Sequence, residues 1–306
     1  MWKVLLNRVV GMIIVLIGVS ILAFALVRMG GGDPALMLAG DNASPEQLTA
    51  LREKMGLDKS YIAQYFSYVK NVLSGDLGWS WKYSTTVNAL LADRLPKTAQ
   101  LAGFAVLVGI CFSIPLGLIA GVKRGSGADV FAMLFAILGQ SLSPVWVGCV
   151  VILVFGAILK WFPTQGIGGL KYMVLPGVTL ALESAAMTTR LMRSGMIDVL
   201  QEDYITTTRA RGISKFKVNT KYALKNAIIP IITNVGSNIG YMMAGSLVVE
   251  NLFGWPGMGQ LMIQSINMRD YQVVQSVLLV SAVIFSFCNL LADIAYTFVD
   301  PRISFN

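Results

Sequence analysis

The stretch EDYITTTRARGISKFKVNTKYALKNAIIP, residues 202–230, is highly charged within an otherwise apolar chain and lies between two apolar stretches. This elbow, as we call residues 202–230, predicts two short helices separated at Gly212, because glycine favours the left-handed conformation that ends helices. Asp198, followed by Gln201 at capping-box spacing, predicts the start of the first helix, and Ser214 predicts the start of the second. A basic helical elbow held at a membrane surface is typical of a docking element.

Composition places the chain in the membrane. Hydrophobic residues make up 55% of the chain and charged residues 13%, whereas a soluble domain carries about 25% charged residues. The absence of histidine excludes histidine metal sites, histidine general bases and Ser-His triads. The three cysteines lie inside apolar runs without metal-binding spacing, so we predict packing roles and no metal site: Cys111, Cys149 and Cys288.

Six apolar stretches are long enough to cross a bilayer, which requires roughly 20 residues each. The predicted spans are 9–27, 98–122, 130–159, 172–189, 226–249 and 271–292, the last continuing past Asp293 to Val299. We expect a bend at Pro144 and a kink near Pro230. The sequence therefore predicts an all-α integral membrane protein with six transmembrane helices.

The charge distribution sets the orientation of these spans. With the N-terminus inside, the short outer loops contain only Lys160, Lys171 and Arg269 as basic residues. Lysine and arginine collect on the cytoplasmic side of membrane proteins, so both termini and the elbow are expected in the cytoplasm. The expected division is an N-terminus with the first span (1–29), an extracytoplasmic helical segment (30–97) and a five-helix core (98–306).

The extracytoplasmic segment is expected to be folded. Ser44-Pro45-Glu46-Gln47 predicts a capped helix that ends at Gly56, and a second helix is expected over Tyr61–Leu73, ending near Gly75. Its aromatic residues suit a membrane interface: Tyr61, Tyr65, Phe66, Tyr68, Trp79, Trp81 and Tyr83. Two interpretations stay open, a cap over the mouth of a pathway and a structural collar on the lipid headgroups.

The elbow has two possible contacts. The sequence contains no P-loop, so any ATPase that drives the chain must be another polypeptide. The apolar candidates for a partner groove are Tyr204, Ile205, Ile213 and Phe216. A stripe of lysines lies beside them at four-residue spacing: Lys217, Lys221 and Lys225. The alternative is an interfacial helix whose lysines face anionic lipid.

Several short motifs follow one another in an order that resembles a known family. They are Gly30-Gly31-Gly32-Asp33-Pro34, Gly56-Leu57-Asp58, Gly75-Asp76-Leu77-Gly78, Glu202-Asp203-Tyr204, Arg209-Ala210-Arg211-Gly212, Leu224-Lys225-Asn226-Ala227-Ile228-Ile229-Pro230, Glu250-Asn251-Leu252-Phe253-Gly254-Trp255-Pro256-Gly257-Met258-Gly259, Arg269-Asp270-Tyr271 and Asp300-Pro301-Arg302. Together they resemble permease subunits of bacterial ABC importers, in the branch that moves peptides, nickel and related solutes. The resemblance covers essentially the whole chain.

This resemblance implies a multi-pass protein of the bacterial inner membrane that is not itself an enzyme. The implied partners are a second, similar permease, two cytoplasmic ATPase subunits that carry ATP and magnesium, and an extracytoplasmic solute-binding protein. No cofactor is expected in this chain. Di- and oligopeptides are the first expected solutes and nickel or a metal chelate the second, with glutathione-like and opine-like solutes also open. The competing class is an ion-driven secondary transporter or channel, although we find neither internal symmetry nor a filter-like element.

The resemblance also assigns the ATPase-coupling role to residues 195–229. The expected contact residues are Glu202, Asp203, Tyr204, Thr206, Arg209, Arg211, Gly212 and Phe216. Thr206-Thr207-Thr208 stand where the general importer loop has Glu-Ala-Ala. The ionic contact is therefore open among Glu202, Asp203, Arg209 and Arg211.

Two further sets of candidate residues are expected, one inside the membrane and one at the outer surface of the membrane. Ionisable residues inside a membrane are costly, which makes Glu183 a candidate for meeting a cationic group of the solute; the alternative is a structural pair with Arg190 or a partner subunit. The other pathway candidates are Ser237, Asn238 and Tyr241. Gly236 and Gly240 permit close helix packing. The outer turn is represented by Glu250, Pro256 and Gly257, and Glu250 is expected to fix that turn through backbone hydrogen bonds near the binding-protein dock.

Overall fold

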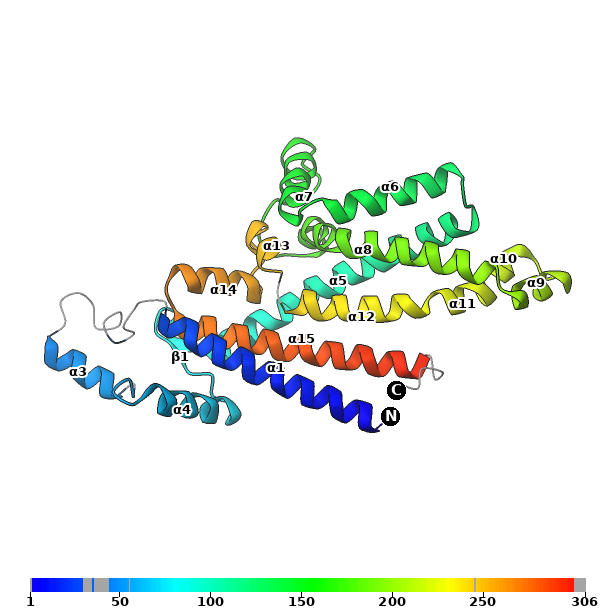
Figure 1. The fold of residues 1–306 in the computed structure, drawn as a ribbon. Coiled ribbons are helices and arrows are strands. Elements are labelled where there is room, and N and C mark those ends of the chain that lie inside the picture. Colours follow the sequence, from blue (N-terminus) through cyan, green and yellow to red (C-terminus); the bar gives the residue numbers. More distant parts are fainter. Residues whose placement is uncertain (1, 30–34, 36–43, 55, 245, 300–306) are drawn as a thin grey trace. The chain divides into compact units, whose positions relative to one another are not determined.

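The computed structural model describes residues 2–29, 35, 44–54, 56–244 and 246–299, and these residues are mostly helical (Figure 1). The chain divides into two compact units, one formed by Met1–Leu95 with Leu261–Val283 and one by Pro96–Gln260 with Ile284–Asn306. Two motifs used above, Gly30–Pro34 and Asp300–Arg302, lie outside the described residues.

The first unit contains α1 (Trp2–Met29), α3 (Pro45–Lys54) and α4 (Tyr61–Leu73). The predicted capping box is confirmed. Ser44 N–H donates to Gln47 Oε1 at 3.2 Å, and Gln47 N–H donates to Ser44 Oγ at 3.2 Å. The bounds predicted for α4 are also confirmed, because the local cap signals at both ends were sufficient to define this helix.

A short hairpin in the same unit joins two of the sequence motifs. Strands β1 (Trp79–Ser80) and β2 (Thr85–Thr86) pair antiparallel, with Trp79 opposite Thr86. The Ser80 hydroxyl donates to the Asp270 carboxylate, and Gln272 Nε2 donates to the Leu77 carbonyl at 2.7 Å. The hairpin is thereby fastened to the beginning of α15 (Tyr271–Val299), and its flanking motif meets the motif around Asp270.

The second unit is built around α8 (Leu170–Leu200), against which α5 (Val87–Val122) and α6 (Gly127–Ser141) pack. A Cβ added at Gly117 of α5 would lie 2.6 Å from Met192 Cβ of α8, and one at Gly139 of α6 would lie 2.6 Å from Ala186 Cβ. The missing side chains therefore allow the helices to approach closely, as small residues do in membrane bundles.

The third predicted span bends where expected. Helix α6 is followed by α7 (Pro144–Val151) and the π-helical η1 (Ile152–Ile158), and the two halves are bent by 108°. Proline at the first turn begins a new helix here, with the Ser143 hydroxyl accepting from Val145 N–H at 3.3 Å.

The elbow and the segment after it consist of short helices. They are α9 (Asp203–Ala210), α10 (Lys215–Lys217), the π-helical η2 (Val218–Ala223), α11 (Leu224–Ala227), α12 (Ile229–Met243), α13 (Leu247–Leu252) and α14 (Met258–Asn267). The break predicted near Pro230 is confirmed between α11 and α12. Two expectations are wrong. Asp198 lies inside α8 rather than at the cap of α9, which is Glu202, and the single helix expected over 226–249 ends at Met243.

Three described helices are long and apolar enough to cross a membrane: Arg8–Leu26, Val87–Val122 and Tyr271–Ile294. A fourth is obtained if the bent pair formed by α6 with α7 and η1 is one span. The remaining two predicted spans correspond to α8, which carries Glu183, and α12, which is 15 residues long. Both are helical, but they are more polar or shorter than an independent transmembrane helix.

Candidate functional site

The elbow is held to the end of α8 by a buried apolar cluster. Ile205 of α9 and Val218 of η2 are fully buried together with Met192 and Met196 of α8. Ile205 was expected among the partner-facing residues, and this expectation is wrong. Ile205 lies on the face of α9 that packs against this cluster, where burial of the side chain contributes about 2 kcal/mol to stability.

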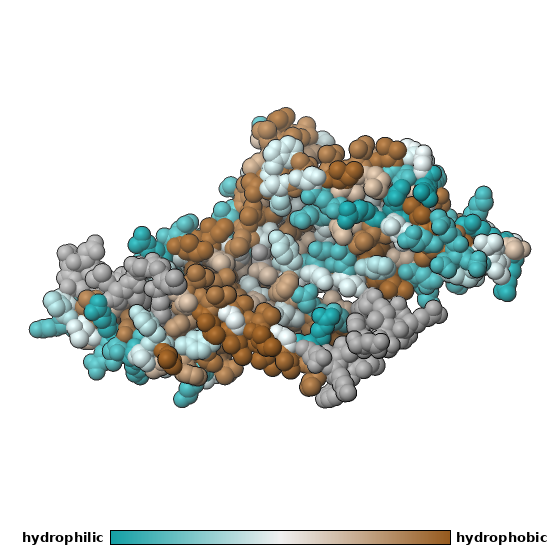
Figure 2. All heavy atoms as spheres, viewed as in Figure 1, coloured by the Kyte–Doolittle hydropathy of each residue, from teal (hydrophilic) through white to brown (hydrophobic). Residues whose placement is uncertain are grey.

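The opposite face of the elbow is exposed. Phe216 of α10 is 78% exposed. Tyr204 of α9 is also exposed, and its hydroxyl accepts from Asn226 Nδ2 at 2.7 Å. The predicted charged and polar contact residues also lie at the surface: Glu202, Asp203, Thr206, Arg209 and Arg211. Figure 2 shows the resulting hydrophilic surface over the elbow, at the right of the view.

The candidate charged residues of the elbow form no ion pairs with one another or with other described residues. Among the described residues, none of Glu202, Asp203, Arg209 and Arg211 is in an ion pair. All four therefore stay candidates for the ionic contact with a partner. Lys217, Lys221 and Lys225 are exposed as well, so the lysine stripe is equally accessible.

Gly212 ends α9 in the left-handed conformation, with φ of +76°. A Cβ at this position would meet no atom within 4 Å. The requirement for glycine is therefore conformational rather than steric, since a side chain costs about 1–2 kcal/mol in this region of φ and ψ. The predicted helix stop at Gly212 is confirmed.

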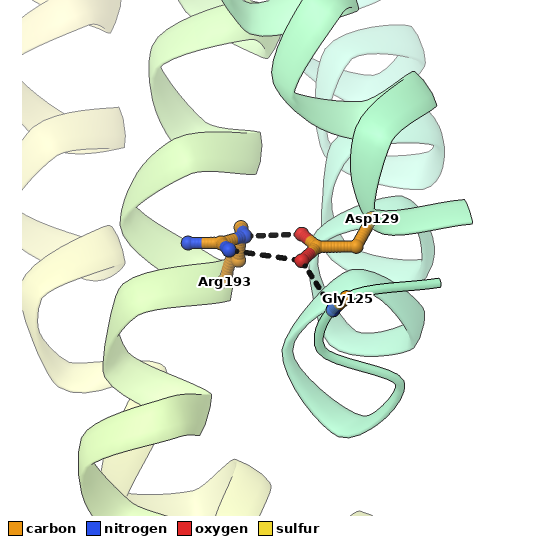
Figure 3. Close-up of polar contacts among 3 residues, drawn as sticks. All are labelled: Gly125, Asp129 and Arg193. Carbon is orange, nitrogen blue, oxygen red and sulfur yellow. Dashed lines mark hydrogen bonds and ion pairs between the residues drawn. The ribbon is translucent and has the colours of Figure 1, made fainter. Parts of the chain in front are cut away.

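An ion pair that sequence reasoning missed joins the α5–α6 turn to α8 (Figure 3). Arg193 Nη2 donates to Asp129 Oδ2 at 2.9 Å, and Arg193 Nε donates to the other carboxylate oxygen. The Gly125 N–H also donates to Asp129 Oδ2, at 2.9 Å. Asp129 is only 5% exposed, so loss of Arg193 would leave a buried charge without its main partner.

This ion pair lies next to the anchor of the elbow. Arg193 follows Met192 in α8, and Met192 belongs to the buried cluster that holds Ile205. The apolar anchor of the elbow and the ion pair therefore occupy the same turn of α8. The sequence signal was weak because Asp129 and Arg193 are separated by 64 positions.

The contacts of α8 with α11 and α12 give the register of these helices, and from it the level of the predicted pathway residues. Thr188 Oγ1 donates to Asn234 Oδ1 at 3.5 Å, and a Cβ at Gly195 would lie 3.1 Å from the Ala227 carbonyl. In each contacting pair the two residue numbers add up to 422. A constant sum means that one segment runs in the opposite direction to the other, so the two are antiparallel. Glu183 then matches position 239, within about one helical turn of Ser237, Asn238 and Tyr241.

The polar side chains at this level differ in exposure. Glu183, Ser237 and Tyr241 are exposed, whereas Asn238 is half-buried and donates from Nδ2 to Asn234 Oδ1 at 3.0 Å. Asn234 was not predicted, although its four-residue spacing from Asn238 was visible in the sequence. Glu183 is not paired with Arg190 within the described residues, and the Arg190 guanidinium instead contacts Met187 Sδ at 3.1 Å.

Gly236 and Gly240 face a neighbouring helix. A Cβ at Gly236 would lie 3.3 Å from Ala292 Cα, and one at Gly240 would lie 3.1 Å from Cys288 Cβ. Both neighbours belong to α15. The predicted role of the two glycines in close helix approach is confirmed.

The outer turn, Glu250–Gly259, is organised by a buried carboxylate. Glu250 is 1% exposed, and its Oε2 accepts from Gly259 N–H at 2.7 Å and from Gln260 N–H at 3.2 Å. Its Oε1 accepts from the Thr98 hydroxyl at 2.9 Å, which itself accepts from Met258 N–H at 2.9 Å. The prediction that Glu250 fixes this turn through backbone hydrogen bonds is confirmed.

Gly257 and Pro256 shape the same turn. A Cβ at Gly257 would lie 2.5 Å from both Glu250 Cδ and Thr98 Oγ1, so glycine is required by space. Pro256 is half-buried, and the preceding Trp255 is fully buried with its indole N–H donating to the Lys97 carbonyl at 2.9 Å. The turn is therefore a rigid packed element.

Helices long and apolar enough to span a membrane, together with an exposed basic helical elbow, are typical of a membrane transport subunit. Residues 113–305 match the family model described as "Binding-protein-dependent transport system inner membrane component", and residues 1–102 match the model for the N-terminal part of such membrane components. The chain belongs to this family. It is an ABC importer permease subunit, a multi-pass protein of the inner membrane.

Individual relatives agree with this assignment. The chain is 36% identical to the glutathione transport system permease protein GsiC of Escherichia coli (strain K12) over 305 residues, covering 100% of both chains. It is 35% identical to GsiC of Salmonella paratyphi A, again over the full length of both. An inward-facing structure of the MetNI methionine ABC transporter shares the fold, with a TM-score of 0.57, 17% identity and coverage of 69% of this chain and 96% of that chain.

Proposed function

We propose that the protein imports small peptides of the glutathione type as one half of a permease heterodimer, driven by two cytoplasmic ATPase subunits and supplied by a solute-binding protein. The full-length relationship to GsiC, at 36% identity, supports this class of solute. In the proposed arrangement six helices cross the membrane, α8 and α12 included, and both termini are cytoplasmic. Residues 30–97 then form the extracytoplasmic segment, and residues 98–306 form the core with the coupling loop 195–229.

The observation that carries this proposal is the two-sided elbow. One face is locked into α8 through Ile205 and Met192, whereas the other face leaves Phe216 in solvent. An exposed aromatic side chain surrounded by charges is typical of a protein-binding hot spot. ATP binding has to favour one transporter conformation through contacts that differ between the states, and we place these contacts on the exposed face.

The buried anchor gives the mechanical route for coupling. When the ATPases close, force on the exposed face would be transmitted through Ile205 to Met192 and Met196 of α8. The Asp129–Arg193 ion pair would transmit it to the α5–α6 turn. In this account the elbow and three helices move as one body because their contacts are buried and specific.

Solute contact is proposed at the polar level of α8 and α12. Glutathione and small peptides carry an ammonium group, which a carboxylate at membrane depth would meet favourably, and Glu183 is exposed at that level. Ser237, Asn238 and Tyr241 would supply hydrogen bonds. Among the described residues there is no group of three or more potential metal ligands, so a nickel chelate would have to pass here without ligation by such a group.

The experiment is to purify the chain with its neighbouring subunits and reconstitute the complex in liposomes. We expect a bound ATPase, stimulation of ATP hydrolysis by glutathione- or peptide-loaded binding protein, and uptake that needs internal ATP. The Glu183→Gln variant should retain stimulated hydrolysis but lose peptide uptake, because the ammonium group of the peptide loses its carboxylate partner. Uptake driven by an ion gradient without ATPase subunits would contradict the proposal. So would ATP hydrolysis that is stimulated by a nickel chelate but not by any peptide.

A further inference from the structure

Helix α4 is attached to α1 at a level inside the membrane-spanning stretch. The Tyr65 hydroxyl of α4 hydrogen-bonds the Ser20 hydroxyl of α1 at 2.8 Å. The Phe24 ring packs edge-on against Tyr65, with 5.3 Å between ring centroids, and contacts Tyr68 at 6.1 Å. Ser20 and Phe24 both belong to the apolar stretch Arg8–Leu26. Ser20 is six residues before Leu26, so the attachment point lies about 9 Å below the outer end of that stretch.

The side chains of α4 form three distinct faces. At 3.6 residues per turn, Tyr65 and Tyr68 share the face that contacts α1. A second face presents Ile62, Phe66 and Leu73, whose exposed fractions are 70%, 67% and 83%. A third face carries Ser67 and Asn71, which are exposed and polar. The helix therefore has one face packed against α1, one exposed apolar face and one exposed polar face.

We propose that α4 lies in the outer leaflet of the bilayer, with Ile62, Phe66 and Leu73 in contact with lipid acyl chains and Ser67 and Asn71 toward the headgroups and water. Helix α1, to which α4 is attached, also exposes apolar side chains such as Ile17 and Leu22 along its apolar stretch. In the region of α1, Figure 2 shows an apolar surface.

The charged residues of α4 agree with lipid as the occupant. Lys59 precedes the helix and Lys70 lies in its last turn, and both are exposed. Long lysine side chains bury their methylene groups in an interface while the ammonium group reaches the phosphates. A protein partner for this face would have to displace lipid from a helix that is held below the outer end of α1.

The consequence concerns the extracytoplasmic segment. Of the two interpretations left open by the sequence, the collar on the membrane is favoured for α4 over a cap suspended above the pathway. An embedded α4 would hold the segment between the first two spans at a fixed depth. This inference stands whether the transported solute is a peptide or another compound.

Spin labels can measure the depth of α4 directly. In a background with Cys111→Ser, Cys149→Ser and Cys288→Ser, single cysteines are placed by Phe66→Cys and Leu73→Cys on the apolar face. Ser67→Cys and Asn71→Cys are the matched controls on the polar face. The complete transporter is reconstituted in vesicles of phosphatidylethanolamine and phosphatidylglycerol, and label relaxation by oxygen and by a water-soluble nickel chelate is compared.

Oxygen partitions into acyl chains and the nickel chelate stays in water. We expect oxygen to relax the labels at positions 66 and 73 several-fold more effectively than the nickel chelate does. At positions 67 and 71 the order should be reversed. Access of the nickel chelate to position 66 equal to that at position 67 would overturn the inference, since α4 would then be in water. Protection of position 66 from both reagents would also overturn it, because a protein partner would cover the face.

Discussion

The elbow and the outer turn are both rich in predicted site residues, yet they are stabilised in opposite ways. In the outer turn the functional-looking carboxylate of Glu250 is buried, and its two oxygens accept three hydrogen bonds. In the elbow the charged candidates are exposed and unpaired within the described residues, and stability comes from apolar anchors such as Ile205. A buried, satisfied polar group fixes a shape, whereas an exposed group over a buried anchor is suited to meet a partner.

The largest effect on stability is expected at the centre of the outer turn. Glu250→Ala removes the acceptor for Gly259 N–H, Gln260 N–H and the Thr98 hydroxyl, and each buried donor left without a partner costs about 1–3 kcal/mol. We expect a loss of roughly 4 kcal/mol in total, seen as a lower midpoint of thermal unfolding in detergent. Asn251→Ala, at the exposed neighbour, is the control and should leave the midpoint unchanged.

The next effect tests the buried side of the elbow. Ile205→Ala leaves a cavity beside Met192 and Met196 and should cost about 3 kcal/mol. Phe216→Ala removes an exposed ring and should change the free energy of unfolding by less than about 0.5 kcal/mol. Uptake should fall in both variants, but only Ile205→Ala should lower the unfolding midpoint. Equal loss of stability would show that the two faces of the elbow do not differ.

Gly257 tests the space available in the outer turn. In Gly257→Ala the new methyl group must displace the Glu250 carboxylate or Thr98, and overpacking of this kind costs about 2 kcal/mol. The matched change is Gly212→Ala in the elbow, where a Cβ meets no neighbouring atom and the cost is that of its positive φ alone. Thermal unfolding of the two variants should place Gly257→Ala lower.

A modest change in stability at Gly212 should have a large functional consequence. Gly212→Val introduces a β-branched side chain at a φ of +76° and costs about 1–2 kcal/mol. The protein should insert normally but lose uptake, because the second half of the elbow changes direction relative to the first. Gly212→Asn is the control, since asparagine tolerates the left-handed conformation, and it should retain most of the uptake. Normal uptake by Gly212→Val would show that the geometry at this position is not used for coupling.

Features with a local signal could be predicted from the sequence. The capping box of Ser44 with Gln47, the bounds of α4 and the bend at Pro144 follow from residues a few positions apart. Helix α15 was predicted to begin at Tyr271 and end at Val299, as it does. In the outer turn, the role of Glu250 was predictable because a buried acid next to a glycine-rich turn needs backbone donors nearby.

Features that depend on distant packing could not be predicted. The ion pair of Asp129 with Arg193 depends on the way α6 packs against α8, and no sequence pattern near either residue predicts the pairing. The burial of Ile205 depends on the way α9 packs against α8, because an apolar residue in a short helix can be either a buried anchor or a partner contact. Asn234 was missed because its significance depends on the antiparallel level of Thr188.

The central claim is that the exposed face of the elbow contacts the ATPase. A photoreactive benzoylphenylalanine at position 216 replaces one aromatic side chain by another, and the same residue at Lys221 or Lys225 probes the lysine stripe. In the complete transporter with bound ATP, the account predicts an efficient cross-link from position 216 to the ATPase subunit. Cross-linking of position 216 to lipid, or to no partner, would contradict it.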